Sequence, residues 1–271
     1  MRLAMVVQWL RAGAGDPGHR TTARRYAIGI SVLQVAWVLT LAAPQLWVPA
    51  FVFLAACELL VPAWAESAQQ TTWHPHHISE RYGLLTLIVL GESILAASVA
   101  IQSSLAAGGT VLALVPVVVG GLLIVYSMWW VYFDHPVHDL LTHFRKAMLW
   151  GYGHYFVFAS AAAVGAGLGV AVDQAAHHAE ISSVAAGFAV AVPVTVFIAS
   201  LWVLHDRPEH REARPAGAVA LVLILLSPLT GQGVLLTGLT FAAFVAVRLV
   251  LRRRAEHAQA ATADGAAVHS H

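Results

Sequence analysis

Histidine and carboxylate side chains gather in two polar segments of an otherwise apolar chain, at 74–80 and 134–143. Imidazole and carboxylate together can bind divalent zinc, iron, nickel or manganese. If the segments are helical, pairs such as His76 and Glu80 share one face. The candidate ligands of a divalent metal are His74, His76, His77, Glu80, Asp134, His135, His138 and Asp139. Because their spacing matches no specific zinc signature, we favour the alternative, a polar histidine-rich loop without metal.

Three further ionisable residues, Glu58, Glu92 and His154, lie inside long apolar runs. Counted at helical rise from the polar end of each run, they lie roughly 10, 16 and 12 Å deep. A carboxylate at such a depth costs roughly 2.5 to 3.5 kcal/mol, so these residues should face a bundle interior or a wet cavity. Two interpretations follow: a site for a proton or small cation, or structural hydrogen bonds that tie helices together. We favour the first.

Arg81 is a fourth candidate, because it falls on the same helical stripe as Glu92 at a spacing of eleven residues. The two side chains are too far apart to touch, but they could face the same cavity. The alternative, of equal weight, is an anchor at the level of the lipid phosphates.

The elements that must position these residues are transmembrane helices. Of 271 residues, 59% are hydrophobic and 11% charged, against about 25% charged in soluble domains. A bilayer-spanning helix needs roughly 20 mostly apolar residues. These data predict an all-α, polytopic helical transmembrane bundle of about eight spans, at 26–43, 46–65, 82–101, 109–133, 147–172, 181–204, 216–229 and 232–251.

The last two spans come from one uncharged run, 216–247. As a single helix this run would be roughly 48 Å long, whereas the hydrocarbon core is about 30 Å thick. Pro228, Gly231 and Gly233 lie in its middle and favour a turn. We therefore predict a tight hairpin of two helices, the first of which is short.

All 15 lysines and arginines fall on one side of this eight-span arrangement. The positive-inside rule then places both termini in the cytoplasm of a multi-pass protein of the bacterial plasma membrane. We predict a cytoplasmic N-terminal segment at 1–25, a transmembrane helical domain at 26–251 and a disordered cytoplasmic tail at 252–271.

Three motifs carry a resemblance to a known family. Residues 73–83 read WHPHHISERYG and continue to GESILA at 91–96, while 129–134 read WWVYFD and 152–156 read YGHYF. This pattern resembles the bacterial low temperature requirement A (LtrA) family over nearly the whole chain. Members usually begin with a segment like Glu-Leu-Phe-Phe-Asp-Leu-Val-Phe, which is missing here, so we expect an incomplete N-terminus. The resemblance implies a membrane protein linked to growth in the cold and assigns no catalytic residue.

Three hypotheses of function remain. The first is a transporter or channel that moves a proton or small solute through Glu58, Glu92 and His154. The second is a membrane-embedded enzyme that acts on lipid at the cytoplasmic His/Asp/Glu loops. The third is a non-catalytic membrane factor for growth in the cold. We expect membrane lipids and a homo-oligomer as partners, and no nucleic acid, because no binding motif for it occurs.

Overall fold

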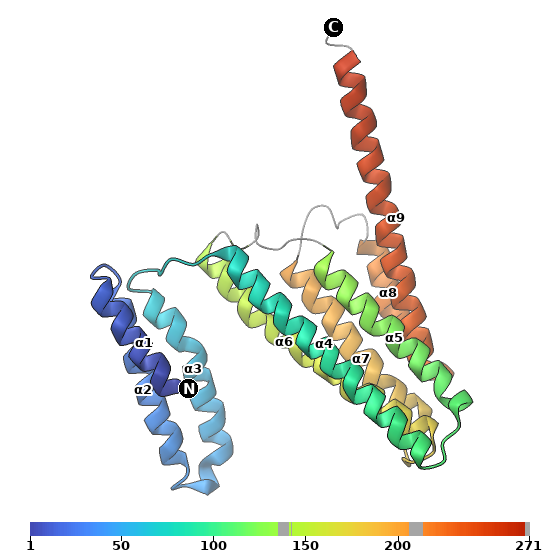
Figure 1. The fold of residues 1–271 in the computed structure, drawn as a ribbon, viewed down its shortest axis with the longest axis horizontal. Coiled ribbons are helices and arrows are strands. Elements are labelled where there is room, and N and C mark those ends of the chain that lie inside the picture. The colour runs from blue at the N-terminus through green and yellow to red at the C-terminus, as the bar shows by residue number, and fades with distance from the viewer. Residues whose placement is uncertain (135–140, 142, 206–213, 269–271) are drawn as a thin grey trace. The chain divides into compact units, whose positions relative to one another are not determined.

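The computed structural model describes the chain except residues 135–140, 142, 206–213 and 269–271, with 255, 256 and 258–268 described by their backbone alone. Every regular element in these described ranges is a helix (Figure 1). The helices form two compact units, Met1–His74 and Pro75–His271. The predicted all-α class is therefore confirmed, whereas the membrane topology of 1–25 and 252–271 stays a prediction.

The first unit contains α1 (Arg2–Gly15), α2 (Arg20–Thr40), the 3-10 turn η1 (Pro44–Leu46) and α3 (Trp47–Glu66). Helices α1 and α2 run antiparallel, because Trp9 stacks on Tyr26 with ring centroids 4.0 Å apart while Gly13 packs against Ala23. Helix α1 therefore packs against the first part of α2.

In its described residues the second unit contains six helices and the 3-10 turn η4 (Ser227–Thr230), which precedes the last helix. The helices are α4 (Pro75–Ala106), α5 (Val111–Phe133), α6 (Phe144–Ala175), α7 (Ser183–Leu204), α8 (Arg214–Leu226) and α9 (Gly233–Val268). Helix α6 packs along both α4 and α7, and α5 packs along α9. Helix α9 continues through most of the segment predicted to be a tail.

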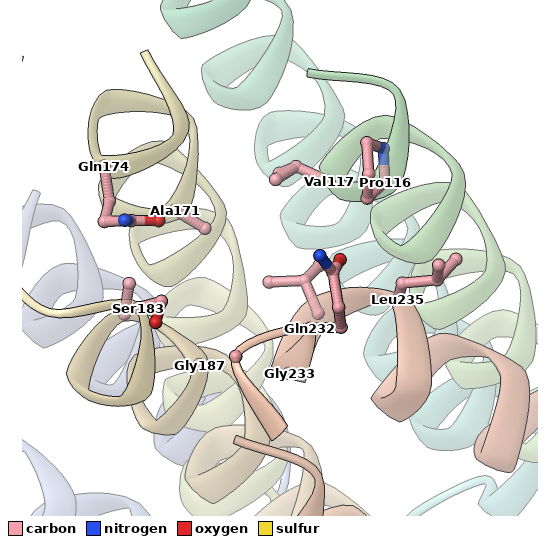
Figure 2. A pocket seen from close by; sticks show the side chains of 12 residues that line it. Pro116, Val117, Ala171, Gln174, Ser183, Gly187, Gln232, Gly233 and Leu235 are labelled. Atoms are coloured by element: carbon pink, nitrogen blue, oxygen red, sulfur yellow. The ribbon is translucent and has the colours of Figure 1, made fainter. Parts of the chain in front are cut away.

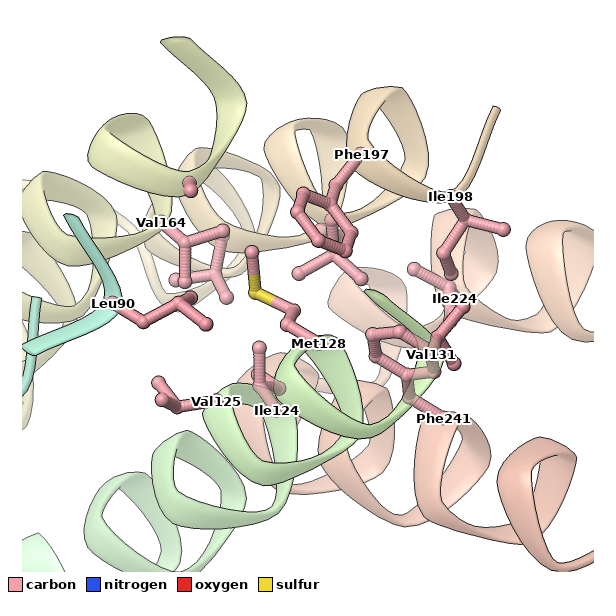
Figure 3. Packing of buried hydrophobic residues seen from close by; sticks show 14 of the residues in the cluster. Leu90, Ile124, Val125, Met128, Val131, Val164, Phe197, Ile198, Ile224 and Phe241 are labelled. Atoms are coloured by element: carbon pink, nitrogen blue, oxygen red, sulfur yellow. The ribbon is translucent and has the colours of Figure 1, made fainter. Parts of the chain in front are cut away.

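One hydrophobic core joins all six helices of this unit (Figure 3). Its members come from α4 to α9 in turn and include Leu90, Ile124, Met128, Val164, Phe197, Ile224 and Phe241. Because this core extends through the centre of the unit, it separates the polar groups at one end of the helices from those at the other.

Glycines allow the closest helix contacts. A Cβ added to Gly120 on α5 would lie 2.5 Å from the carbonyl oxygen of Val234 on α9. A Cβ on Gly167 of α6 would overlap the carbonyl oxygen of Ala189 on α7. Small residues at such contacts are typical of membrane helices, where van der Waals packing drives association.

The predicted number of about eight spans is too high. Within the described residues, six helices are long and apolar enough to cross a membrane: Pro44–Glu66, Pro75–Ala106, Val111–Phe133, Phe144–Ala175, Ser183–Leu204 and Gly233–Arg254. Helix α2 falls short because its first turns carry Arg20, Arg24 and Arg25. Helix α8 falls short because its 13 residues span only about 20 Å.

The hairpin between α8 and α9 forms where Pro228, Gly231 and Gly233 predicted a turn. Gly231 adopts a left-handed conformation with φ of 76°, which ends the 3-10 turn and reverses the chain. The hydroxyls of Ser227 and Thr237 lie 2.8 Å apart and join the two arms. Both predictions, the turn and the short first arm, are confirmed.

Candidate functional site

Glu58 lies on α3 of the first unit and accepts two hydrogen bonds. Arg2 of α1 donates to one carboxylate oxygen at 2.7 Å, and the indole N–H of Trp37 on α2 donates to the other at 3.2 Å. A guanidinium and an indole thus offset the cost of placing a carboxylate in an apolar helix. Glu58 therefore joins the three helices of this unit.

Glu92 and Arg81 both lie on α4 of the second unit, and both are exposed. No hydrogen bond or ion pair links either side chain to another residue of the described ranges. The structure does not bring Glu92 into contact with His154. Since Glu58 belongs to the other unit, the shared layer of Glu58, Glu92 and His154 stays a prediction.

His154, on α6, is the centre of a buried polar and aromatic cluster. Its side chain is 0% exposed. Tyr82 of α4, Tyr132 of α5 and Trp150 of α6 surround the imidazole, with ring centroids 4.9, 5.9 and 3.8 Å away. The predicted inward orientation of His154 is thus observed within this unit, and three helices supply its contacts.

Both ring nitrogens of His154 are hydrogen-bonded. Nδ1 lies 2.7 Å from the carbonyl oxygen of Trp150, and Nε2 lies 3.2 Å from the hydroxyl of Tyr132. A carbonyl oxygen only accepts, so Nδ1 carries a hydrogen. In the neutral imidazole this fixes the tautomer, and Nε2 then accepts from the Tyr132 hydroxyl.

A second imidazole, His205, completes the cluster. It follows the last residue of α7, is 8% exposed, and its ring centroid lies 6.0 Å from that of His154 and 5.7 Å from that of Tyr132. The indole N–H of Trp150 is buried and has no hydrogen-bond partner among the described residues. The cluster therefore holds two imidazoles, the two phenols of Tyr82 and Tyr132, and one indole N–H without a partner among the described residues.

Sequence reasoning missed Tyr132 and His205. Tyr132 lies in the motif WWVYFD at the end of the fourth predicted span, where the sequence analysis gave it no role of its own. His205 lies one residue beyond the predicted sixth span, next to a charged loop. The only available signal for His205 was that a histidine directly followed an apolar helix.

The predicted metal ligands do not converge within the described residues. No group of three or more His, Cys, Asp or Glu side chains there could hold a metal ion. His77 lies 3.7 Å from Glu80, and both side chains are largely exposed, as are His74 and His76. Three predicted ligands lie outside the described residues, namely His135, His138 and Asp139. The metal site therefore stays a prediction.

Asp134, also a predicted ligand, is engaged by two arginines of α9. Its carboxylate oxygens lie 3.0 Å from Arg248 and 3.2 Å from Arg252. The Asp134 side chain is 9% exposed. Two cationic partners compete directly with a metal ion for these oxygens, so this residue acts in the structure as a link between α5 and α9.

Glu66, at the end of α3, is a buried carboxylate that the sequence analysis did not single out. It accepts hydrogen bonds from the hydroxyl of Tyr26 at 3.0 Å and from the backbone N–H and hydroxyl of Thr71 at 2.7 and 2.8 Å. Three donors satisfy the charge. Glu66 therefore ties the segment after α3 to α2.

A groove of about 350 Å³ lies between α4 and α6 of the second unit. Its lining includes Arg81, Tyr82 and Leu85 from α4 and Gly151, Tyr155 and Phe158 from α6. Tyr82 forms part of its wall and also contacts the ring of His154. The groove is thus separated from the buried imidazole by a single aromatic ring.

A much smaller pocket, about 40 Å³, lies among the start of α5, the end of α6, the start of α7 and the turn before α9 (Figure 2). The amides of Gln174 and Gln232 and the hydroxyl of Ser183 belong to its lining. This volume holds one or two water molecules. It lies at the opposite ends of these helices from His154.

Six long apolar helices in the described residues, five of which share one hydrophobic core in the second unit, define a multi-pass helical membrane protein. The model of one family, the bacterial low temperature requirement A protein (LtrA), matches residues 1–252, and the chain belongs to this family. The resemblance seen in the sequence is therefore confirmed. No curated protein and no solved structure matches the chain.

Proposed function

We propose that this LtrA protein is a proton transporter of the plasma membrane, in which His154 takes up and releases the transported proton. The observation that carries the proposal is the hydrogen bond between Nε2 of a fully buried His154 and the hydroxyl of Tyr132. Ionisable residues inside membrane bundles commonly belong to ion or proton pathways.

Protonation of His154 would change the contact between α5 and α6. The neutral ring accepts from Tyr132, whereas an imidazolium has two N–H donors and no free lone pair. A proton on Nε2 therefore requires the Tyr132 hydroxyl to turn from donor to acceptor or to move away. Because Tyr132 and His154 lie on different helices, a proton at this nitrogen is coupled to helix packing.

The position of the cluster supports entry of the proton from one side. Tyr132 is the penultimate residue of α5, His205 directly follows α7, and His154 lies near the start of α6. These helix ends lie together at one end of the second unit, and the positive-inside rule predicts that this end faces the cytoplasm. Toward the other end the core is apolar (Figure 3), which supports an alternating mechanism over an open pore.

Glu92 belongs to the proposal as a second proton-binding group. An exposed carboxyl within an apolar span is costly unless it is protonated or meets a polar partner. Glu92 has no partner among the residues that the structure describes. We expect Glu92→Gln to reduce proton flux without unfolding the protein, and proton flux at the wild-type rate would remove Glu92 from the pathway.

The test is proton flux into liposomes that contain the purified full-length protein and a trapped pH-sensitive dye. With an imposed pH gradient, we expect a dye response above that of empty liposomes. His154→Gln removes the titrating group and Tyr132→Phe removes only one hydroxyl, so both should slow the response. Tyr126→Phe is the matched control, because Tyr126 lies on the same helix and is 70% exposed.

A wild-type response equal to that of empty liposomes would contradict the proposal. An unchanged response in His154→Gln would exclude His154 as the proton carrier. The folded state of each variant is checked by its thermal unfolding in detergent, so that loss of flux is separated from loss of structure.

A further inference from the structure

The groove between α4 and α6 has one polar end and one apolar end. Arg81 is the seventh residue of α4 and Gly151 the eighth of α6, so both lie at the same level near the helix starts. The two helices run in parallel, since Tyr82 contacts Trp150 and Ser93 donates to the carbonyl oxygen of Ala161. Higher residue numbers on α4 and on α6 therefore both lead from the same end of the groove toward the other.

The apolar end of the groove lies deeper in the span. Leu85 lies about 6 Å beyond Arg81 along α4, and Phe158 about 10 Å beyond Gly151 along α6. Tyr155, which is 70% exposed, borders the groove between these levels. The gradient from a guanidinium to aliphatic and aromatic carbon matches the gradient from headgroup to acyl chain in a lipid leaflet.

Two polar groups at the headgroup level are available to a ligand. Arg81 is exposed, and no ion pair engages it within the described ranges. The Tyr82 hydroxyl has room in the groove wall because residue 151 is glycine: an added Cβ there would lie 2.9 Å from this oxygen. A guanidinium and a phenol hydroxyl are donors that suit a phosphate oxygen.

We propose that this groove is a binding site for one phospholipid with a net negative headgroup. Arg81 and Tyr82 contact the phosphate, and the first part of an acyl chain lies along Leu85 and Phe158. Arginine supplies the charge complementarity, and the bilayer around six apolar helices supplies the occupant. This proposal does not depend on proton transport, because it concerns a surface of α4 and α6 and not the protonation of His154.

The test uses the full-length protein in vesicles that contain a trace of a photoactivatable phospholipid with its diazirine on the acyl chain. The probe carries either a phosphoglycerol or a phosphocholine headgroup. Peptide mapping should place the crosslinks of the anionic probe at residues 81–85 and 151–158. Arg81→Gln should reduce this labelling about fivefold, which is the effect of one cationic side chain at an anionic lipid surface.

The matched control is Arg253→Gln, which removes an exposed arginine from α9. It should leave labelling at the groove unchanged. Equal labelling by the phosphocholine probe, or undiminished labelling in Arg81→Gln, would overturn the proposal. Complete competition by inorganic phosphate would identify a site for free phosphate, and crosslinking of these positions to another part of the chain in place of lipid would identify a protein contact.

Discussion

Asp134 and Arg248 form an ion pair of 3.0 Å although 114 residues separate them in the chain. Both side chains are close to buried, at 9% and 12% exposed. Arg252 adds a second contact to the same carboxylate at 3.2 Å. The pair fixes the end of α5 against α9, next to the cluster that contains Tyr132.

Asp134→Asn should destabilise the protein by about 3 kcal/mol, because it leaves a nearly buried arginine without a counter-charge. The measurement is the free energy of unfolding in detergent. Asp173→Asn, at an exposed position on α6, is the control and should have little effect. In the double variant Asp134→Asn, Arg248→Gln, the loss should be smaller than the sum of the single losses. Additive losses would mean that the pair makes no net contribution.

Two glycines of α6, Gly167 and Gly169, should differ sharply in their tolerance of substitution by alanine. A Cβ on Gly167 would overlap the carbonyl oxygen of Ala189, whereas a Cβ on Gly169 would meet no atom within 4 Å. Gly167→Ala should therefore cost about 1 to 3 kcal/mol through overpacking of α6 on α7. Gly169→Ala should be neutral or slightly stabilising. The measurement is the thermal unfolding of the two variants. Equal stability of Gly167→Ala and Gly169→Ala would contradict the close packing of α6 on α7.

The turn between α1 and α2 should respond to pH. Nδ1 of His19 lies 2.7 Å from a carboxylate oxygen of Asp16. This hydrogen bond raises the pKa of His19 and lowers the pKa of Asp16. The contribution of His19 is fully present below its ordinary pKa of 6.5 and is lost as the pH rises through the raised value. The contribution of Asp16 is present above its ordinary pKa of 3.8 and is lost as the pH falls through the lowered value.

The turn should thus be best protected between pH 3.8 and 6.5. The measurement is the hydrogen-exchange protection of the Gly18 amide, which donates to Asp16 at 3.0 Å, corrected for the intrinsic exchange rate. In His19→Asn the decline at high pH should disappear while the decline at low pH persists. Protection that does not change across this range would show that the pair has no effect on the turn.

The parallel packing of α4 and α6 gives a direct test of topology. Ser103, near the end of α4, and Gln174, near the end of α6, should lie on the same side of the membrane. In a Cys57→Ala background, cysteines at these two positions should react with an impermeant maleimide on intact cells. A cysteine at His257 should react only after permeabilisation. Reaction of that cysteine on intact cells would contradict the cytoplasmic C-terminus.

The sequence alone determined the class of the protein and the positions of most helices. Bilayer insertion depends on the summed hydrophobicity of about 20 consecutive residues, which is a local property. The turn at Gly231 could also be predicted from the sequence, because the preference of glycine for a left-handed conformation is a local property of the residue. The same local rule overcounted the spans at α2 and α8, where arginines or a short helix reduce the apolar length.

Only the tertiary structure decided which polar residues meet. In a soluble helix the buried face is marked by its apolar residues, but a membrane helix is apolar all round and its sequence leaves the rotation about its axis open. Depth therefore suggested a common layer for Glu92 and His154, whereas packing turned His154 into the bundle and left Glu92 on its surface. Tyr132 reaches His154, and Arg248 reaches Asp134, only because α5 packs beside α6 and α9 in three dimensions.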